Sequence, residues 1–247
     1  MRRLLGLAAL ALLTACGSGG PPPPDWKTDA ADLVERYQKH ALLGENKLAE
    51  SYFSKAVAAT GGAGRVAETA RLWLVRCATR RAMLIDDACP QYADLAAATT
   101  DPASDAYHRF LTLRWEDLDP ALLPRHYGDM LRAPADRRHD LLGRIDDPLA
   151  RLLASSLLVM RHEADAQTLS LAAETASERG WRQPLLGYLK LQETQAVTTG
   201  DAEALARLRL RIRLVEAQLL PESAAPPLSA RTQQPHTTLT IPKRRKL

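Results

Sequence analysis

The 247-residue chain lacks the short motifs that mark common catalytic sites. It has no Gly-x-x-x-x-Gly-Lys phosphate loop, no His-Glu-x-x-His zinc motif and no Ser placed three residues before a Lys. Its histidines are dispersed along the chain: His40, His108, His126, His139, His162 and His236. These absences argue against nucleotide-binding, metalloprotease and serine acyl-transfer chemistry. We therefore expect no catalytic residue, no metal site and no cofactor.

Aromatic residues are also scarce, at 5% of the chain, and long apolar runs are missing. Ala, Leu, Arg and Glu dominate, and few windows show the alternating β-branched pattern of a strand, which predicts an all-α protein. The apolar run from Leu4 to Leu13 has about ten residues, whereas a helix needs about 20 to cross a bilayer. It fits a cleavable signal better than a membrane span.

A basic start and a small-residue box surround this apolar run. Arg2-Arg3 precede it, and Leu13-Thr14-Ala15-Cys16 close it. The arrangement resembles a bacterial lipoprotein signal, which implies that residues 1–15 are removed and that Cys16 becomes an N-terminus carrying several acyl chains. Gly17 after the cysteine, rather than Asp, resembles the sorting signal for the outer membrane, with inner-membrane anchoring as the less favoured alternative. An ordinary secretory signal with a chance cysteine is the alternative to lipidation.

The remaining chain divides by composition into a linker, a folded body and a tail. Residues 16–27 contain Gly17-Ser18-Gly19-Gly20 and then four prolines, which predicts a flexible and then stiff spacer. Residues 28–220 are long enough for one helical domain. In residues 221–247 prolines recur among Ser, Thr and Gln, which predicts a disordered basic tail.

Periodic apolar positions place the helices of the body in pairs. Gly200-Asp201 supplies a break and an N-cap before a helix whose inner face is Leu205, Leu208, Ile212, Val215 and Leu219. Asp147-Pro148 opens another helix, with Leu149, Leu152, Leu153, Ser156, Leu157 and Met160 inward. Arg179-Gly180 predicts a helix end and Pro184 the next start. Helix pairs should therefore span about 148–184 and 184–219, and 104–133 should hold shorter helices interrupted by Asp119-Pro120 and Ala133-Pro134.

The first helix pair carries a repeat-like pattern. Leu33, Tyr37 and Ala41 are followed by three further small or aromatic positions, Ala49, Phe53 and Ala56. This spacing resembles the packing positions of a tetratricopeptide repeat, although Tyr37 stands where a small residue is usual and Gly61 replaces the closing Pro. The resemblance implies an irregular array of antiparallel helices, and a generic helix pair is the alternative.

Two cysteines remain after Cys16, and we expect them to form a disulfide. Export would place Cys77 and Cys89 in an oxidising compartment. Cys77 belongs to an apolar face with Val66, Ala70, Trp73 and Leu74, and Cys89 directly precedes Pro90. Because a continuous helix would separate them by about 18 Å, the chain must reverse near residues 85–88. A metal or redox site is the alternative, but neither a CxxC nor clustered histidines support it.

One fragment resembles a catalytic signature. Glu50-Ser51-Tyr52-Phe53, followed by Gly61-Gly62-Ala63-Gly64, is similar to the Glu-Ser-x-Phe and Gly-Ala elements of lytic transglycosylases. In that family the Glu is a general acid, which would assign this role to Glu50. The chain departs from the family where Gly-Leu-Met-Gln is replaced by Gly64-Arg65-Val66-Ala67, and the later Tyr-Asn element is missing. We therefore expect Glu50 to be a surface residue.

Basic side chains near the C-terminus are candidate contacts for an anionic partner. Removal of Arg2 and Arg3 lowers the formal net charge from +4 to +2, so the mature chain would be nearly neutral. The candidates are Arg207, Arg209, Arg211 and Arg213 on the last helix and Lys243, Arg244, Arg245 and Lys246 at the chain end. They suit an acidic envelope partner or lipid phosphates rather than nucleic acid. A solvated helix face and a solubilising tail are the alternative.

The combined pattern predicts a lipid-anchored, periplasm-facing helical scaffold. Its partners would be the membrane, through Cys16, and another envelope protein or peptide, with assembly or maintenance of an envelope complex as the role. Two alternatives stay open at this point. One is a peptidoglycan-cleaving enzyme that uses Glu50, and the other is a structural lipoprotein without a dedicated groove.

Overall fold

The computed structural model describes residues 24–219, which form helices joined by short loops and contain no strand. This confirms the all-α prediction. The α-helices and 3₁₀ helices are α1 (Asp25–Leu43), α2 (Asn46–Gly62), α3 (Val66–Ala82), α4 (Pro90–Ala96), α5 (Pro102–Leu111), η1 (Pro120–Leu122), α6 (Arg125–Arg132), η2 (Ala135–Arg144), α7 (Pro148–Met160), α8 (Ala166–Glu178), α9 (Arg182–Thr199) and α10 (Ala202–Leu219). The expected signal 1–15, most of the linker and the tail 221–247 lie outside the described residues.

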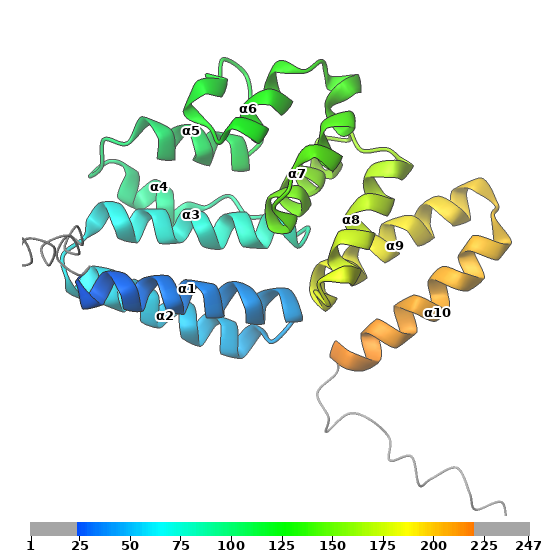
Figure 1. Cartoon of the computed structure of the whole chain (residues 1–247), viewed down its shortest axis with the longest axis horizontal. Coiled ribbons are helices and arrows are strands. Elements are labelled where there is room, and N and C mark those ends of the chain that lie inside the picture. Colours follow the sequence, from blue (N-terminus) through cyan, green and yellow to red (C-terminus); the bar gives the residue numbers. More distant parts are fainter. Residues whose placement is uncertain (1–23, 220–247) are drawn as a thin grey trace, which may run out of the picture.

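The helices stack as neighbouring pairs (Figure 1). Helix α1 packs on α2, α3 packs on α7, and α7, α8, α9 and α10 follow one another, each against the next. The shorter helices α4 and α5 pack on α3, and α6 packs on η1 and η2, of which η2 also contacts α7. The result is an irregular helical array, as the repeat-like pairs predicted. Among residues 24–219, no helix is long and apolar enough to span a membrane.

Aspartate caps and turn residues set the helix boundaries. The carboxylate of Asp147 accepts a hydrogen bond from the Ala150 backbone N–H at 2.6 Å, and Asp201 accepts one from Ala204 at 2.9 Å. Such caps satisfy backbone donors that the first helical turn leaves free. Gly200 ends α9 in the left-handed region, with φ of 70°, where a side chain would be strained. The predicted starts of α7 and α10 are therefore confirmed.

The first hairpin packs through the residues of the repeat-like pattern. Five of its six positions are buried, Tyr37, Ala41, Ala49, Phe53 and Ala56, and Leu33 is only partly buried. The rings of Tyr37 and Phe53 lie 5.1 Å apart between their centroids. Small residues at the other positions let the two helices approach closely, so the pattern predicts the packing correctly.

The middle of the chain is held by a cluster of aromatic and charged side chains. Trp115, in the loop after α5, lies 5.1 Å from the guanidinium of Arg138 and 4.2 Å from that of Arg161, measured to its ring centroid. Glu163 binds both guanidinium groups, at 2.7 Å to Arg138 and 2.8 Å to Arg161. The indole also stacks on the fully buried Phe110, with centroids 5.2 Å apart. These contacts join the loop after α5, η2 and the α7–α8 loop.

A closing contact joins the first hairpin to the last one. The Arg182 guanidinium, at the start of α9, donates to the Leu43 carbonyl oxygen at 3.1 Å and pairs with Glu45 at 3.3 Å. The end of α10 reaches the same loop, because a Cβ added to Gly44 would overlap the Leu219 side chain. Gly44 also has a positive φ of 83°, so two independent constraints favour glycine there. The array is therefore closed at one side rather than an open solenoid.

Three boundary and burial predictions were wrong in detail. Helix α1 begins at Asp25, so the expected linker 16–27 overlaps it by three residues. Helix α9 begins at Arg182, and Pro184 lies inside its first turn, where a missing backbone N–H leaves no helical bond unmade. Val66 is 43% exposed because it starts α3 at the edge of the array, whereas Ala70, Leu74 and Cys77 of the same predicted face are buried.

Candidate functional site

A groove lies between α8 and α10, with α9 as its floor. We call it the terminal groove. Helix α9 packs against both neighbours, which sets α8 and α10 apart as walls (Figure 1). The cavity measures about 430 Å³, within the range of small-ligand pockets. It is lined by Ala166, Ser170, Gln192, Gln195, Ala196, Thr199, Asp201, Ala204, Arg207, Leu208 and Arg211.

The groove floor contains an unused hydrogen-bond acceptor. The Gln192 amide nitrogen donates to the Ser170 hydroxyl at 3.2 Å, which links α9 to α8. The amide oxygen of Gln192 is buried and has no hydrogen-bond partner within residues 24–219. A buried acceptor without a partner is costly, and because this oxygen is buried, a ligand in the groove reaches it only if the Gln192 side chain moves.

The candidate arginines of α10 are divided between two sides of that helix. Arg207 and Arg211 line the terminal groove, and Arg207 also pairs with Glu203 one turn earlier. Arg209 lies on the other side and pairs with Glu193 at 2.9 Å. Arg213 is exposed, and neither it nor Arg211 pairs with a carboxylate in the described part of the chain. Two of the four arginines therefore lie on each side of α10, and they do not form one cluster.

The other predicted site residues belong to the two ends of the chain. Cys16 lies outside the described residues, as do Lys243, Arg244, Arg245 and Lys246. Sequence reasoning also missed the polar floor of the groove. The segment Gln192-Glu193-Thr194-Gln195 has the composition of a solvated helix face, and only the neighbouring helices turn part of it into a floor.

A second, smaller hollow lies on the side where α1, α3, α5, α6 and α7 meet. Its volume is about 190 Å³, below the usual range for ligand pockets. Two of its lining residues, Tyr107 and Tyr127, stack with ring centroids 6.2 Å apart, and burial raises the pKa of both phenols. Because this hollow is small and filled by aromatic packing, it offers less room for a partner than the terminal groove.

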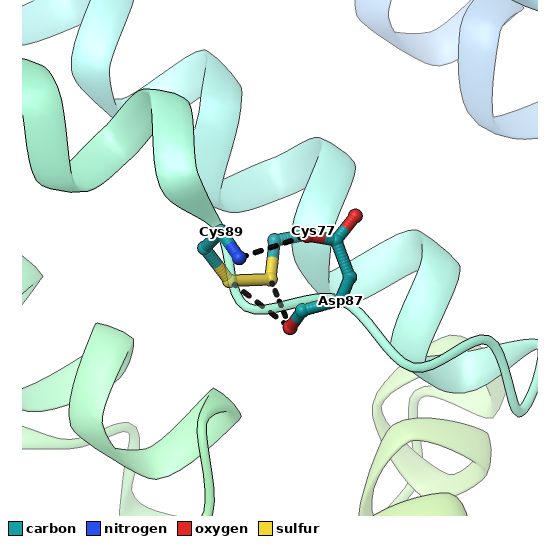
Figure 2. Close-up of side chains that lie close together, drawn as sticks. All are labelled: Cys77, Asp87 and Cys89. Carbon is teal, nitrogen blue, oxygen red and sulfur yellow. Dashed lines mark hydrogen bonds between the residues drawn. A yellow bond between two sulfur atoms is a disulfide. The ribbon is translucent and has the colours of Figure 1, made fainter.

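Cys77 and Cys89 lie at disulfide distance, with their Cα atoms 5.6 Å apart, and Figure 2 shows the sulfurs joined. Helix α3 ends at Ala82, and the chain then reverses through residues 83–89 before α4 begins at Pro90. The reversal predicted at residues 85–88 is therefore confirmed. Cys89 has a positive φ of 55°, an uncommon backbone conformation that the surrounding contacts hold in place.

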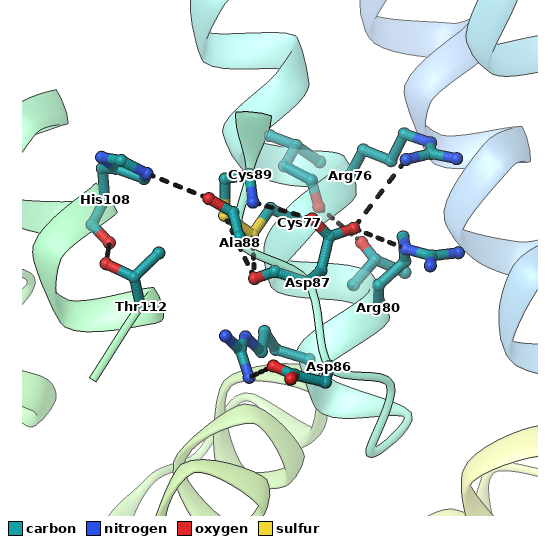
Figure 3. Close-up of a disulfide and its surroundings, with 12 residues drawn as sticks. Arg76, Cys77, Arg80, Asp86, Asp87, Ala88, Cys89, His108 and Thr112 are labelled. Carbon is teal, nitrogen blue, oxygen red and sulfur yellow. Dashed lines mark hydrogen bonds and ion pairs between the residues drawn. A yellow bond between two sulfur atoms is a disulfide. The ribbon is translucent and has the colours of Figure 1, made fainter. Parts of the chain in front are cut away.

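Polar contacts hold this loop against α3 and α5 (Figure 3). The Asp87 carboxylate accepts from the Cys89 backbone N–H at 2.8 Å and from the Arg80 guanidinium at 2.6 Å. A ring nitrogen of His108 lies 3.5 Å from the Ala88 carbonyl oxygen, and burial lowers the pKa of His108. The lowered pKa favours the neutral ring, whose Nε2–H tautomer can donate to that carbonyl.

Cys77, Asp87 and Cys89 also have the composition of a metal-binding group, with their ligand atoms within 4.8 Å of one another. Two features of the site oppose this use. The sulfurs are bonded to each other and so offer no thiolates, and the Asp87 carboxylate forms an ion pair with Arg80. The geometry is that of a structural cross-link.

We expect loss of this cross-link to lower the free energy of unfolding by up to about 3 kcal/mol, since it closes a short loop in the unfolded chain. The Cys77→Ser/Cys89→Ser variant and the wild-type protein should be compared by urea denaturation with and without reductant. Reductant should destabilise the wild type and leave the double variant unchanged. Equal sensitivity of the two proteins would contradict the disulfide.

Glu50 lies on the surface of α2, where it contacts α3. Its side chain is 46% exposed and pairs with the Arg76 guanidinium at 2.9 Å. The neighbouring Phe53 is buried, and its ring packs against Trp73 at 4.8 Å between centroids. In the geometry of a general acid, a carboxyl group faces a substrate cleft. Glu50 instead serves an ion pair between two helices.

The comparisons with known proteins add no family to this description. No protein-family model, no curated protein and no solved structure matches the chain.

Proposed function

We propose that the protein is a lipid-anchored, periplasm-facing scaffold that binds another envelope protein at the terminal groove. Cys16 would carry the anchor, with the outer membrane as its location. The role would be assembly or maintenance of an envelope complex. Binding, rather than turnover, fits a helical array that presents an extended surface on stacked helices.

The observation that carries this proposal is the presence of two arginines on the groove wall, of which Arg211 pairs with no carboxylate among residues 24–219. Arg207 and Arg211, one turn apart on the groove wall, suit carboxylates of a bound segment. A protein segment with acidic side chains therefore suits the groove better than an apolar ligand.

The alternative of a peptidoglycan-cleaving enzyme has less support. It depends on Glu50, whose carboxylate is bound to Arg76 on the surface of two packed helices. Among residues 24–219, Glu50 lines neither the terminal groove nor the smaller hollow. Turnover of purified peptidoglycan that is abolished by Glu50→Gln would overturn our choice.

The experiment that tests the scaffold is site-specific photo-crosslinking in the native envelope. A photoreactive residue should replace Gln195 on the groove floor, and Ser51, an exposed position on α2, serves as the matched control. We expect a protein adduct from position 195 and none from position 51. Charge reversal by Arg207→Glu with Arg211→Glu should reduce the adduct by about tenfold, as two rim ion pairs become repulsive.

Two outcomes would contradict the proposal. Equal adducts from positions 195 and 51 would indicate contact without a specific site. No reproducible adduct from position 195 would favour a structural lipoprotein without a dedicated groove.

A further inference from the structure

The face of α10 that points away from α9 carries an apolar stripe, which we call the α10 stripe. It consists of Ala206, Leu210, Leu214 and Ala217, all of them exposed. Leu210 is 52% exposed and Leu214 is 63% exposed, and they lie one turn apart. The opposite face, which includes the buried Ile212, packs on α9. Helix α10 is therefore apolar on two faces, and the array covers only one of them.

Arginines flank the stripe on both sides. Successive residues of a helix are rotated by about 100°, which places Arg209 and Arg213 along one edge of the stripe and Arg207 and Arg211 along the other. Arg207 and Arg211 also line the terminal groove, so the stripe and the groove occupy adjoining sides of α10. One partner can cover both.

This pattern matches one face of a helix pair. Two helices pack through leucines spaced three and four residues apart, and charged residues beside that seam select the partner by sign. Arginine on both edges selects a helix whose apolar seam is bordered by Asp or Glu. Isolated exposed leucines are common, but two at helical spacing between four arginines form a complementary surface.

The chain itself does not supply such a helix. Residues 1–23 contain no Asp or Glu. Residues 220–247 contain one acidic residue, Glu222, against five basic ones, Arg231, Lys243, Arg244, Arg245 and Lys246. A second copy of α10 would set arginines against arginines along both edges. Repulsion therefore disfavours both the tail and a second copy as the occupant.

The position of α10 disfavours a lipid surface. The end of α10 nearest to α1 meets the loop at Gly44, and α1 spans 19 residues, about 28 Å, from there back to Asp25. In Figure 1 the rest of α10 lies still farther from the start of α1. Because an anchor at Cys16 would precede Asp25, α10 lies at the end of the described structure farthest from the point where the anchored segment enters it.

We infer that the α10 stripe docks an amphipathic helix with acidic edges, presented by the envelope protein that the terminal groove binds. The partner's apolar seam covers Leu210 and Leu214. Its carboxylates pair with Arg211 and Arg213, which pair with no carboxylate among residues 24–219, and compete with Glu203 and Glu193 for Arg207 and Arg209. The inference rests on the proposed function and specifies the chemistry of its partner.

Binding of synthetic helical peptides tests the chemistry directly. The probe is a three-heptad peptide with a leucine seam and Glu at the flanking positions, and the control has the same seam with Lys flanks. Fluorescence anisotropy with the full lipidated chain in nonionic detergent should show binding of the Glu peptide, weakened by added salt, and no binding of the Lys peptide. Equal binding of the two peptides, or no binding of the Glu peptide, overturns the inference.

Variants of the stripe locate the binding. The double variant Leu210→Glu with Leu214→Glu should lower the affinity for the Glu peptide by about tenfold or more. Two leucines lose their apolar contacts, and two charges of the same sign as those of the peptide are added. Leu48→Glu is the matched control, since Leu48 is an exposed leucine on α2, and it should leave binding unchanged. Both positions are exposed, so the fold should tolerate the changes, which thermal unfolding checks. Unchanged binding by the stripe variant overturns the inference.

Two further measurements identify other occupants. The first is co-sedimentation of the unlipidated Cys16→Ser chain with phosphatidylglycerol vesicles. Co-sedimentation that the stripe variant abolishes would show that the α10 stripe contacts lipid. A concentration-dependent dimer that the stripe variant abolishes would make it a contact between copies. Either result overturns the inference. We expect neither.

The crosslinking experiment separates failure of this inference from failure of the proposed function. If the adduct from position 195 persists at full yield in the stripe variant, the scaffold stands and the acidic helix is wrong. If position 195 gives no adduct even in the wild type, the scaffold itself is wrong.

Discussion

Replacing Phe110 by Ala should lower the free energy of unfolding by about 3 to 5 kcal/mol, the usual cost of emptying a buried aromatic site. Phe110 is fully buried, and its ring contacts those of Trp115 at 5.2 Å and Tyr127 at 4.8 Å between centroids. Its carbonyl oxygen accepts a hydrogen bond from the Trp115 indole at 2.8 Å. Losing the ring leaves a cavity in the middle of the chain, between the α1–α2 hairpin and the helices α7 to α10.

Urea denaturation followed by circular dichroism measures this effect. Leu122→Ala is the matched control, because Leu122 is 40% exposed in the same part of the chain, and it should cost less than about 0.5 kcal/mol. Phe110→Leu should fall between the two, since it keeps much of the buried volume. A Phe110→Ala variant as stable as Leu122→Ala would show that the middle section does not depend on this core.

Replacing Glu163 by Gln should lower the free energy of unfolding by about 2 to 4 kcal/mol. The Glu163 side chain is 14% exposed, and its two oxygens bind Arg138 and Arg161 separately. Gln keeps the shape but removes the negative charge. Two guanidinium groups, 14% and 23% exposed, would then face the same indole with no counter-charge. We expect a smaller loss of stability than for a fully buried ion pair, because solvent reaches Arg161.

Glu193→Gln provides the control for this second variant. Glu193 also pairs with an arginine, at 2.9 Å, but Arg209 is 55% exposed, so the change should cost at most about 1 kcal/mol. The two variants should be compared by denaturation at low and high salt. Added salt should change the stability of the Glu193 pair more than that of the Glu163 cluster, because buried charges are screened less. Equal losses for the two variants would contradict the role given to Glu163.

Local signals predicted much of the helical architecture. Asp147-Pro148 and Gly200-Asp201 mark helix starts because capping chemistry acts within a few residues. The cysteine count and the expected export predicted the pairing of Cys77 with Cys89, and the length of a continuous helix then required the chain to reverse between them. In each case the interacting groups are close in sequence.

Features formed between distant segments were not predictable in this way. Arg182 and Leu43 are 139 residues apart, and nothing near either of them signals their hydrogen bond. The pairing of Arg138 with Glu163 and the terminal groove arise likewise from helix packing. The arginines of α10 and its inner face with Ile212 were visible in the sequence, but the groove that Arg207 and Arg211 line forms only when α8 and α9 pack beside α10. The membrane anchor at Cys16 stays a prediction.

The contact between the α1–α2 loop and the end of α10 has a mechanical consequence. A pull applied between Asp25 and Leu219 acts along α1 and then across the loop at Gly44. Helix α9 also lies on this path, because Arg182 at its start donates to the Leu43 carbonyl oxygen. Tension between the two ends would therefore load the Arg182–Leu43 contact as well as the contact of Leu219 with the loop.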